Sequence, residues 1–481
     1  MPVDLYRLAL TVLQPGFEGT NLPEWVRDAL SEGLGGAVLF ARNIDTPEQT
    51  ARLVADMRAA NPAVVVAVDE EGGVVTRFEV REGSSFPGNR ALGVADDLKL
   101  TERTGRQIGR LLAAADVTLD YAPAVDVNAN PANPVIGIRS FGPTADLVSR
   151  HTTAWIAGLQ GAGVAACAKH FPGHGDTATD SHLALPTVHA SREVFDERDL
   201  PPFRAAVRAG VKAIMCGHLL VPALDPELPA TLSRAVLTGL LREELGFDGM
   251  LVTDAIEMKA VAALYSPGEI AVRALNAGVD AICVGITDEA GLAELRDAIV
   301  AAVRSGELPE ERLAEAATRV LAVAAWYGAQ AALREEVRAD VDETIGLEVA
   351  RAALTPHGEV TLSAAPLVVE VNTRLSQAVD PATPSGLTSA LTARLPDTAR
   401  VRMTDGGELP DLPADRPVVL VVHDAGRHPW VRRALAEAER RRPDVIVVET
   451  GIPDTPAGGV YLATHGMSRA SATAAAEWLT S

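Results

Sequence analysis

Residues 169–182 bring together side chains that can carry out acid–base chemistry. The stretch reads Lys169-His170-Phe171-Pro172-Gly173-His174-Gly175-Asp176-Thr177-Ala178-Thr179-Asp180-Ser181-His182 and contains three of the ten histidines of the chain. A short apolar run, residues 164–168, comes directly before it. We therefore expect a buried strand that ends here and a polar loop that follows. Pro172 and Gly173 predict a turn, because proline fixes φ and glycine tolerates positive φ.

Asp180 and His182 are the pair in this stretch best suited to moving a proton. Residues two apart project on the same side of an extended chain, so the carboxylate and the imidazole are expected to face each other. A carboxylate in that place orients the ring and stabilises its protonated form, which makes the histidine a proton donor near neutral pH.

Asp254 is the second candidate, and it directly follows the apolar run 250–253. A carboxylate at the end of a buried strand is costly to keep ionised unless hydrogen bonds or cations compensate. Together with a proton donor on another strand end, it suggests double displacement at an acetal carbon. Asp254 would attack the carbon, while His182 gives a proton to the leaving oxygen and later takes one back. The structural alternative is that Asp254 caps the following turn.

The elements that must position these residues follow a regular pattern. From about residue 8 to residue 330, short apolar runs alternate with amphipathic helical patterns. The runs are residues 8–13, 36–40, 63–68, 118–125, 164–168, 213–216, 250–253 and 281–284. Strands that are apolar on both faces and alternate with helices predict an α/β fold with a parallel sheet, and eight such units can close as a (β/α)8 TIM-type barrel.

A barrel places its active site at the C-terminal ends of its strands. Polar residues follow the third to seventh runs: Asp69-Glu70-Glu71-Gly72-Gly73, Asp126, the stretch 169–182, Gly217-His218 and Asp254. This recurrence favours an active site over a scaffold. The predicted barrel covers residues 1–330, a charged connector covers 331–347, and a second, smaller α/β unit covers 348–481. The glycines of the second unit form no G-x-G-x-x-G motif after a strand, so a dinucleotide site is not supported.

The composition narrows the classes of partner. The chain has 481 residues and a formal net charge of −21, with no long basic block, which argues against nucleic acid and anionic membrane surfaces. Its apolar runs are too short to span a bilayer, and no signal-peptide pattern is visible, so we expect a cytoplasmic protein. The three cysteines, one in each of three strand-like runs, indicate reduced core residues.

Several of these pieces resemble family 3 glycoside hydrolases. They are Gly16-Phe17-Glu18-Gly19, Asp69-Glu70-Glu71-Gly72-Gly73, residues 133–141, Lys169-His170-Phe171-Pro172-Gly173-His174-Gly175 with Asp180-Ser181-His182, and Val252-Thr253-Asp254. More narrowly, they resemble the bacterial β-N-acetylglucosaminidase branch that trims cell-wall muropeptides during recycling. The second unit resembles, more loosely, the αβα domain that follows the barrel in many members.

The resemblance implies a role for each matching residue. Asp254 matches the nucleophile, His182 the general acid/base, and Asp180 its partner. The residues that match N-acetylglucosamine-binding positions are Asp69, Arg77, Arg139, Lys169 and His170. Arginine can donate charge-assisted hydrogen bonds to vicinal hydroxyls and aspartate can accept them, which agrees with that role. The implied ligand is a small-molecule carbohydrate, and neither a cofactor nor a metal is expected.

For three other residues, the sequence indicates a structural role or leaves the role open. His218 follows Met215-Cys216-Gly217, where we expected a small polar residue before the glycine, so contact with substrate and simple core packing both stay open. His174, between two glycines, is expected to fix the loop. Asp176 is expected to serve as a turn residue.

Two alternatives come from other classes. A metal-dependent hydrolase could use His170, His174, Asp176 and His182 as zinc ligands, although their H-x-x-x-H spacing lies in a Gly/Pro loop and not on a helix. A sugar-binding protein without catalysis is the other, but both proposed catalytic residues are present.

The molecule that accepts the glycosyl group from Asp254 in the second step can be water or phosphate. A histidine that has given up its proton is neutral, whereas a carboxylic acid would become an anion. Like charges about 4 Å apart repel by roughly 4 kcal/mol at an effective dielectric of about 20, so a neutral base admits phosphate. We expect hydrolysis, with phosphorolysis as the alternative. The expected pH profile is a bell, with its acid limb set by Asp254 and its basic limb by Asp180 and His182.

Overall fold

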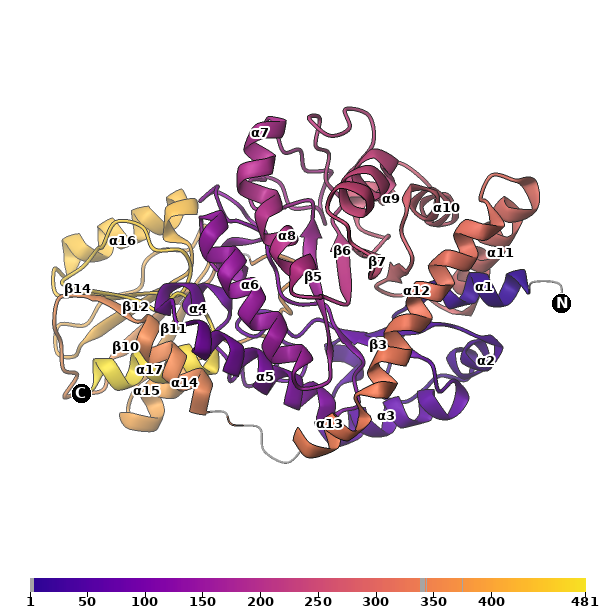
Figure 1. Cartoon of the computed structure of the whole chain (residues 1–481). Helices are drawn as coiled ribbons and strands as arrows, with labels where there is room; N and C mark the ends of the chain where they lie inside the picture. The colour runs from indigo at the N-terminus through magenta and orange to yellow at the C-terminus, as the bar shows by residue number, and fades with distance from the viewer. Residues whose placement is uncertain (1–3, 338–341, 343, 374) are drawn as a thin grey trace. The chain divides into compact units, whose positions relative to one another are not determined.

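The computed structural model describes residues 4–337, 342, 344–373 and 375–481 (Figure 1). The chain divides into two compact units. Unit 1 consists of Met1–Glu70, Thr101–Val127 and Thr144–Val341, and unit 2 of Glu71–Leu100, Asn128–Pro143 and Asp342–Ser481. Of the predicted connector, residues 338–341 and 343 lie outside the described residues, and the predicted linear boundaries stay a prediction.

Unit 1 contains the predicted parallel strands. They are β1 (Leu13–Pro15), β2 (Gly36–Leu39), β3 (Val65–Val68), β4 (Leu119–Asp120), β5 (Ala165–Phe171), β6 (Ala213–Cys216), β7 (Met250–Thr253) and β8 (Ile282–Val284). One sheet has the order β2-β3-β4-β5-β6-β7, and β1 pairs with β8. All these pairs are parallel, and a further parallel bridge joins Val252 to Ala281 beside β8. The predicted α/β class with a parallel sheet is confirmed.

Helices precede, separate and follow these strands. In unit 1 they are α1 (Leu5–Thr11), α2 (Glu24–Glu32), α3 (Pro47–Ala60), α5 (Leu98–Ala114, whose first three residues belong to unit 2), α6 (Ala145–Gln160), α7 (Arg192–Val194), α8 (Leu200–Arg208), α9 (Lys259–Ala262), α10 (Pro267–Ala277), α11 (Glu289–Ser305), α12 (Glu310–Ala329) and α13 (Ala331–Val337). Segments of 3-10 helix are η1 (Ala41–Asn43) and η4 (Ala230–Leu232), and segments of π-helix are η3 (Phe195–Asp199) and η5 (Ala235–Glu244). Local sequence explains several helix starts: the Ser266 and Glu269 side chains, for example, form a capping box at the N-terminus of α10.

The first predicted strand is partly wrong. Residues 8–11 of the apolar run 8–13 belong to helix α1, and strand β1 begins only at Leu13. The Asp4 side chain accepts a hydrogen bond from the Arg7 backbone N–H and caps this helix. An apolar run this short has no periodicity that separates a buried helix from a strand, so the cap decided the structure.

Unit 2 is built on a six-stranded sheet of order β11-β10-β12-β13-β14-β9. Its strands are β9 (Thr355–His357), β10 (Leu367–Val371), β11 (Ala399–Met403), β12 (Val418–Val422), β13 (Ile446–Glu449) and β14 (Val460–Ala463). All neighbours are parallel except β9, which runs antiparallel to β14. Its helices are α4 (Asn89–Ala95), α14 (Thr344–Ala353), α15 (Leu387–Arg394), α16 (Pro429–Arg441) and α17 (Arg469–Leu479), with short segments η2 (Gly137–Arg139) and η6 (Ala425–Arg427).

The sheet of unit 2 has a hydrophobic cluster on each face. Alternate residues of β10 and β12, such as Val369 and Leu420, pack with Val431 of α16. The residues between them, such as Val419, pack with Leu391 of α15 and with residues of α17. This alternation follows from the period of two along a strand and explains why both faces of the sheet are apolar.

Two excursions from the first part of the chain belong to unit 2. Residues 71–100 follow β3, residues 128–143 follow β4, and both pack with the C-terminal segment. Val74 and Ile138 share a hydrophobic cluster with Met467, and Arg469 forms an ion pair with Glu79 at 2.8 Å. The hydrophobic contacts that hold these excursions therefore come from residues more than two hundred positions away in the sequence.

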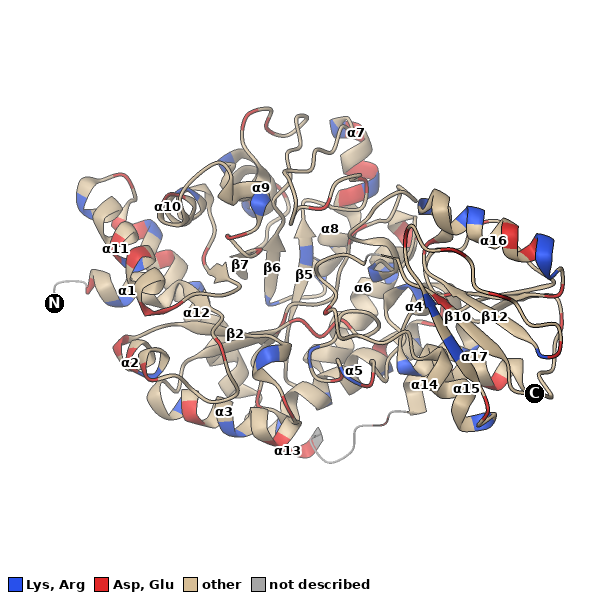
Figure 2. Cartoon of the chain, turned by 180° about the vertical axis from the view of Figure 1, so that it is seen from behind, with Lys and Arg blue, Asp and Glu red and all other residues tan. Residues whose placement is uncertain are grey.

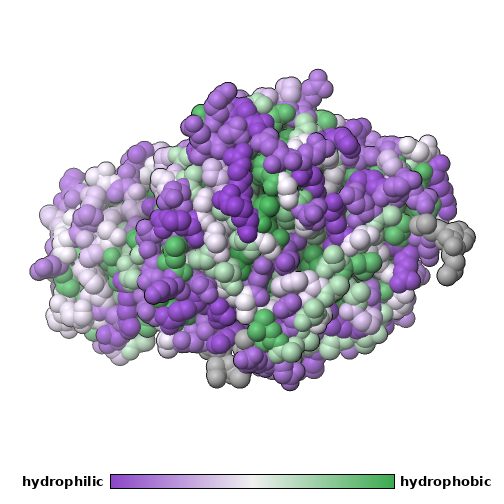
Figure 3. Space-filling model, viewed as in Figure 1, coloured by the Kyte–Doolittle hydropathy of each residue, from purple (hydrophilic) through white to green (hydrophobic). Residues whose placement is uncertain are grey.

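The surface carries charges of both signs. Acidic and basic residues both occur along α16 (Figure 2), and hydrophilic residues are spread over the face seen in Figure 3, with hydrophobic residues between them. None of the helices in the described part of the chain combines the length and the apolar character needed to cross a membrane.

Candidate active site

The end of β5 supplies Lys169 and His170 to the site. Both side chains are buried, and the Lys169 Nζ atom lies 2.7 Å from Oδ1 of Asp69, the residue directly after β3. The two predicted sugar-binding residues therefore form an ion pair. Because a buried ammonium is costly without a partner, Asp69 compensates Lys169 and fixes its position.

Asp126 organises the start of the loop after β5. Its carboxylate lies 2.8 Å from Nδ1 of His170, accepts the backbone N–H of His170 at 3.2 Å, and accepts that of His174 at 2.7 Å. Asp126 is almost fully buried. The sequence marks it only as an ionisable residue after the fourth apolar run and assigns it no role. In the structure it orients the His170 ring through Nδ1.

Asp180 and His182 face each other as predicted from their spacing. Oδ1 of Asp180 lies 2.7 Å from Nδ1 of His182 and accepts the His182 backbone N–H at 2.9 Å. Burial acts to raise the pKa of Asp180, but hydrogen bonds from the ring and the backbone of His182 lower it overall. An ionised Asp180 fixes the ring orientation and favours the imidazolium form.

The loop that carries this pair is tied down at several points. His174 Nδ1 lies 2.7 Å from Thr177 Oγ1, and its Nε2 lies 3.2 Å from Ser181 Oγ. The Ser181 carbonyl accepts the backbone N–H of Ala260, which follows β7, at 3.2 Å. The loop after β5 is thus bonded to helix α9, which follows β7. Asp176 takes part in the same anchoring through an ion pair with Arg198 at 2.9 Å.

Asp254 directly follows β7 and is partly exposed. Its Oδ1 accepts the backbone N–H of Ala255 at 2.8 Å. Burial acts to raise the pKa of Asp254, but electrostatic interactions with His170, His218 and His182 and this hydrogen bond lower it to about 2. Asp254 is therefore ionised at neutral pH and lies within electrostatic reach of three imidazoles.

His218 is the additional residue that the structure brings to this group. It follows β6 and is fully buried, with Nδ1 2.7 Å from Thr231 Oγ1 and Nε2 3.0 Å from the Ala255 carbonyl oxygen. Burial lowers the pKa of His218, which favours the neutral ring, although Asp254 opposes this shift. A neutral ring with its proton on Nε2 donates to Ala255 and supports the residue next to Asp254.

The two predicted sugar-binding arginines belong to unit 2. Arg139 is buried and makes a two-point contact with Glu71, with Nη2 2.7 Å from Oε1 and Nε 3.0 Å from Oε2. Arg77 Nη2 donates to the Ala378 carbonyl at 3.1 Å. The other six predicted residues, namely Asp69, Lys169, His170, Asp180, His182 and Asp254, belong to unit 1.

The four side chains of the metal alternative do not form one cluster. His170 bonds to Asp126, His174 to Thr177 and Ser181, His182 to Asp180, and Asp176 to Arg198. Across residues 4–337, 342, 344–373 and 375–481, no group of three or more His, Cys, Asp or Glu side chains is arranged to hold a metal ion.

A parallel α/β fold that gathers an ionised carboxylate and an Asp–His pair at strand ends is suited to glycosyl transfer to a small acceptor. The chain belongs to glycosyl hydrolase family 3, because residues 17–323 match the N-terminal domain of that family. It is therefore a glycoside hydrolase and acts on a carbohydrate substrate.

Individual relatives support this assignment. The chain is 34% identical over 333 residues to β-hexosaminidase A of Pseudoalteromonas piscicida, covering 63% of this chain and 55% of that protein. It is 38% identical over 259 residues to a β-hexosaminidase of Shewanella frigidimarina, covering 52% and 74%. The chain thus spans about half the length of the first relative.

Solved structures also match nearly the whole chain. Among them is a glycoside hydrolase family 3 β-N-acetylglucosaminidase from Paenibacillus sp. str. FPU-7, with a TM-score of 0.87 and 34% identity, covering 99% of this chain and 97% of that one. A β-N-acetylhexosaminidase from Beutenbergia cavernae has a TM-score of 0.61 at 30% identity, covering 67% and 99%. The second match is shorter and covers about two thirds of this chain.

Proposed function

We propose that the protein is a retaining exo-β-N-acetylglucosaminidase. It would remove terminal N-acetylglucosamine (GlcNAc) from β-glycosides through a covalent glycosyl-aspartate intermediate. The observation that carries this proposal is the Asp180–His182 pair on the loop after β5, which a hydrogen bond from the Ala260 N–H to the Ser181 carbonyl joins to α9, shortly after Asp254 in the chain. The names of the relatives support the sugar, because they include β-hexosaminidases and a β-N-acetylglucosaminidase.

We further propose that unit 1 closes as a (β/α)8 barrel and that unit 2 is an αβα sandwich. The strand order β2 to β7, the β1–β8 pair and the Val252–Ala281 bridge support closure. In unit 2, the apolar clusters that join α16 to one face of the sheet, and α15 and α17 to the other, support three layers. A closed barrel would place the ends of β5, β6 and β7 on one rim.

In the first step, Asp254 attacks the anomeric carbon. Oδ1 is held by the Ala255 N–H, so we assign the attack to Oδ2. A carbon–oxygen ester bond forms while the glycosidic bond breaks, and the departing oxygen keeps the electron pair. That oxygen takes a proton from His182. Because Nδ1 of His182 is engaged by Asp180, we assign the proton to Nε2.

In the second step, a water oxygen attacks the same carbon and gives its proton to Nε2 of His182. The ester bond breaks, and its electron pair returns to Asp254. Two inversions give net retention at the anomeric carbon. His182 ends the cycle protonated again, and Asp180 stabilises that charge throughout.

The remaining predicted residues are proposed to bind the GlcNAc unit. Asp69, Lys169 and His170 are held by buried contacts in unit 1, which gives them fixed positions for bonding to sugar hydroxyls. Arg77 and Arg139 keep the same proposed role. For the aglycone we propose cell-wall muropeptides or related β-GlcNAc glycosides, which comparison of an anhydromuropeptide with N,N′-diacetylchitobiose as substrates would test.

The roles of Asp254 and His182 can be separated with sodium azide and p-nitrophenyl N-acetyl-β-glucosaminide. Asp254→Ala should lose about 10⁴-fold or more in kcat and recover with azide to give the α-glycosyl azide, because azide then displaces the leaving group directly. His182→Ala should lose about 10²–10⁴-fold and give the β-glycosyl azide, because azide then opens the ester.

Matched controls come from exposed residues of the same types. Asp248→Ala and His189→Ala, both in unit 1, should keep wild-type turnover. Retained GlcNAc binding in Asp254→Ala would separate lost catalysis from lost binding. If Asp254→Ala kept its turnover, or if both variants gave the same azide anomer, the assignment of roles would be wrong. Turnover abolished by a chelator and restored by zinc would favour the metal-dependent alternative.

Phosphorolysis is the second candidate, and the use of an imidazole where an acid/base carboxylic acid could stand favours it. After the first step the ring is neutral and admits an anionic acceptor. A phosphate oxygen would then attack the anomeric carbon and release GlcNAc 1-phosphate as the ester bond breaks. Added inorganic phosphate should raise turnover and yield the sugar phosphate; an unchanged rate with GlcNAc alone as product excludes this reaction.

A further inference from the structure

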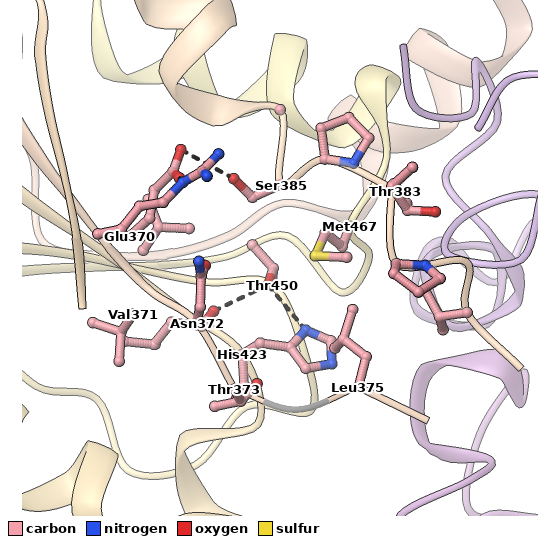
Figure 4. Close-up of a pocket in the computed structure, with 18 of the residues that line it drawn as sticks. Glu370, Val371, Asn372, Thr373, Leu375, Thr383, Ser385, His423, Thr450 and Met467 are labelled. Atoms are coloured by element: carbon pink, nitrogen blue, oxygen red, sulfur yellow. Dashed lines mark hydrogen bonds and ion pairs between the residues drawn. The ribbon is translucent and has the colours of Figure 1, made fainter. Parts of the chain in front are cut away.

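Unit 2 contains a cavity of about 760 Å³ that none of the roles proposed above explains. Its wall includes residues that directly follow three neighbouring strands: Asn372 and Thr373 after β10, His423 after β12, and Thr450 after β13. Figure 4 shows these side chains around one open space, with Met467 and Thr383 across from Asn372. The size is within the range of small-molecule sites, which is roughly 300–1,000 Å³.

The cavity lies at the topological switch point of the sheet. From β10 the chain passes through α15 to β11, on one side of β10. From β12, on the other side of β10, it passes through α16 to β13. These two helices pack on opposite faces of the sheet. Connections that leave neighbouring strands in opposite directions open a crevice at their carboxyl ends, where open α/β sheets bind ligands.

We propose that this cavity binds a neutral, hydroxyl-rich small molecule, namely a mono- or disaccharide. Uncharged hydrogen-bonding side chains provide much of its wall: Asn372, Thr373, Ser376, Thr383, Ser385 and Ser389. Hydroxyl and amide groups can both donate and accept, which suits the vicinal hydroxyls of a sugar. Apolar side chains, such as Leu375 and Met467, face the C–H surfaces of the ring.

The charges of the wall favour a neutral ligand over an anion. The formal charges of Arg400 and Arg402 are balanced by those of Glu370 and Asp380. Glu370 is only 5% exposed. Its carboxylate accepts hydroxyl protons from Thr388 at 2.6 Å and from Ser385 at 3.3 Å, at the start of α15. The negative charge that a helix N-terminus attracts is therefore already supplied by the protein.

Arg402 completes this compensation. Its Nε lies 3.3 Å from Oε2 of Glu370. A carboxylate offers about four acceptor positions. Bonds from Thr388, Ser385 and Arg402 use three of them, so Glu370 can accept one sugar hydroxyl as well. Phosphate or a nucleotide would instead meet this carboxylate and be repelled.

The test is binding calorimetry on the full chain in an Asp254→Asn background, which prevents turnover. The probes are GlcNAc, N,N′-diacetylchitobiose and glucose, with inorganic phosphate and ADP as anionic comparisons. Asn372→Trp and Ser389→Trp place an indole in the cavity from two exposed positions, so one variant can fail to fold without ending the test. Arg433→Ala, an exposed change on α16 that does not line the cavity, is the control.

We expect at least one sugar to bind with an affinity that falls tenfold or more in Asn372→Trp and Ser389→Trp and stays unchanged in Arg433→Ala. All these affinities are measured in the Asp254→Asn background, in which turnover is prevented. A loss of sugar binding in the tryptophan variants therefore does not depend on whether the proposed hydrolysis is correct. The proposal is overturned if every sugar binds the folded tryptophan variants as tightly as it binds the parent. It is also overturned if the variants weaken the binding of phosphate or ADP and not that of a sugar.

Discussion

Asp180 bonds twice to His182 through a single carboxylate oxygen, once to the ring Nδ1 at 2.7 Å and once to the backbone N–H at 2.9 Å. The turn and the ring orientation therefore depend on the same atom. The amide oxygen in Asp180→Asn can still accept both bonds, but it carries no negative charge. The two functions of Asp180, positioning and charge, can thus be separated by comparing Asn with Ala.

We expect Asp180→Asn to lower kcat by about 10–100-fold and to move the basic limb of the pH–rate profile to lower pH, because the imidazolium loses its anion. Asp180→Ala should lose more, since the turn is lost as well. A pH profile of kcat/KM for both variants and for the Asp248→Ala control would measure this. An unshifted basic limb in Asp180→Asn would refute the charge role.

A second prediction concerns the pH dependence of Asp254. Its folded-state pKa of about 2 is below the ordinary value of 3.8, so ionised Asp254 stabilises the fold above about pH 4, and this contribution is lost as the pH falls toward 2. Asp254→Asn should therefore be less stable than the parent at pH 6 by roughly 2 kcal/mol, with a smaller difference at pH 3. Urea unfolding at several pH values measures it.

The same pKa places the acid limb of activity. A limb caused by protonation of Asp254 in the free enzyme lies near pH 2, so kcat/KM should not fall between pH 6 and pH 4 on its account. A decrease in kcat/KM centred above pH 4 would contradict this if it persisted in variants of every other active-site residue, because Asp254 would then be its source.

The ion pair of Lys169 with Asp69 is suited to a double-mutant cycle. Lys169→Met leaves a carboxylate without its partner and should destabilise the fold by about 3 kcal/mol, whereas the double variant with Asp69→Asn should recover part of this loss. GlcNAc should bind weakly to Lys169→Met, to Asp69→Asn and to the double variant, because each of them lacks at least one of the two charged groups proposed to contact the sugar. Thermal unfolding and KM, measured side by side, separate the structural from the binding role.

The contact of Arg139 with Glu71 predicts a stability effect in unit 2. Both side chains are nearly buried, at 5% and 3% exposure, so Glu71→Gln should cost about 3–5 kcal/mol by leaving a buried guanidinium without its anion. Calorimetry against Glu439→Gln, an exposed change on α16, checks this. Equal unfolding temperatures for the two variants would mean that the pair contributes little.

Local patterns were sufficient for much of unit 1. The apolar runs 213–216 and 250–253 coincide with β6 and β7, because four buried residues between turn signals leave little choice of structure. Asp180 and His182 also face each other as their spacing predicts, since the geometry involves only neighbouring residues. The strand predicted for residues 8–13 was wrong for residues 8–11, because Asp4, outside that run, caps a helix that includes them.

The missing parts of the site depend on distant residues. Asp126 bonds to His170 and His174, 44 and 48 positions away, and no local signal announces such a partner. Arg77 and Arg139 look from the sequence like ordinary residues of barrel loops, yet both belong to unit 2. Membership of a compact unit follows from packing with residues such as Met467, which periodicity does not reveal.

The two excursions constrain how the gene could have been assembled or shortened. A chain that stopped after α13 would still carry residues 71–100 and 128–143, but without Met467, Arg469 and the other partners that cover their apolar side chains. Each excursion would then expose Val74 or Ile138 to water. If the C-terminal part were lost in evolution, the apolar residues of both excursions would have to be substituted as well. The two units are therefore expected to be inherited together, although most of unit 2 follows unit 1 in the chain.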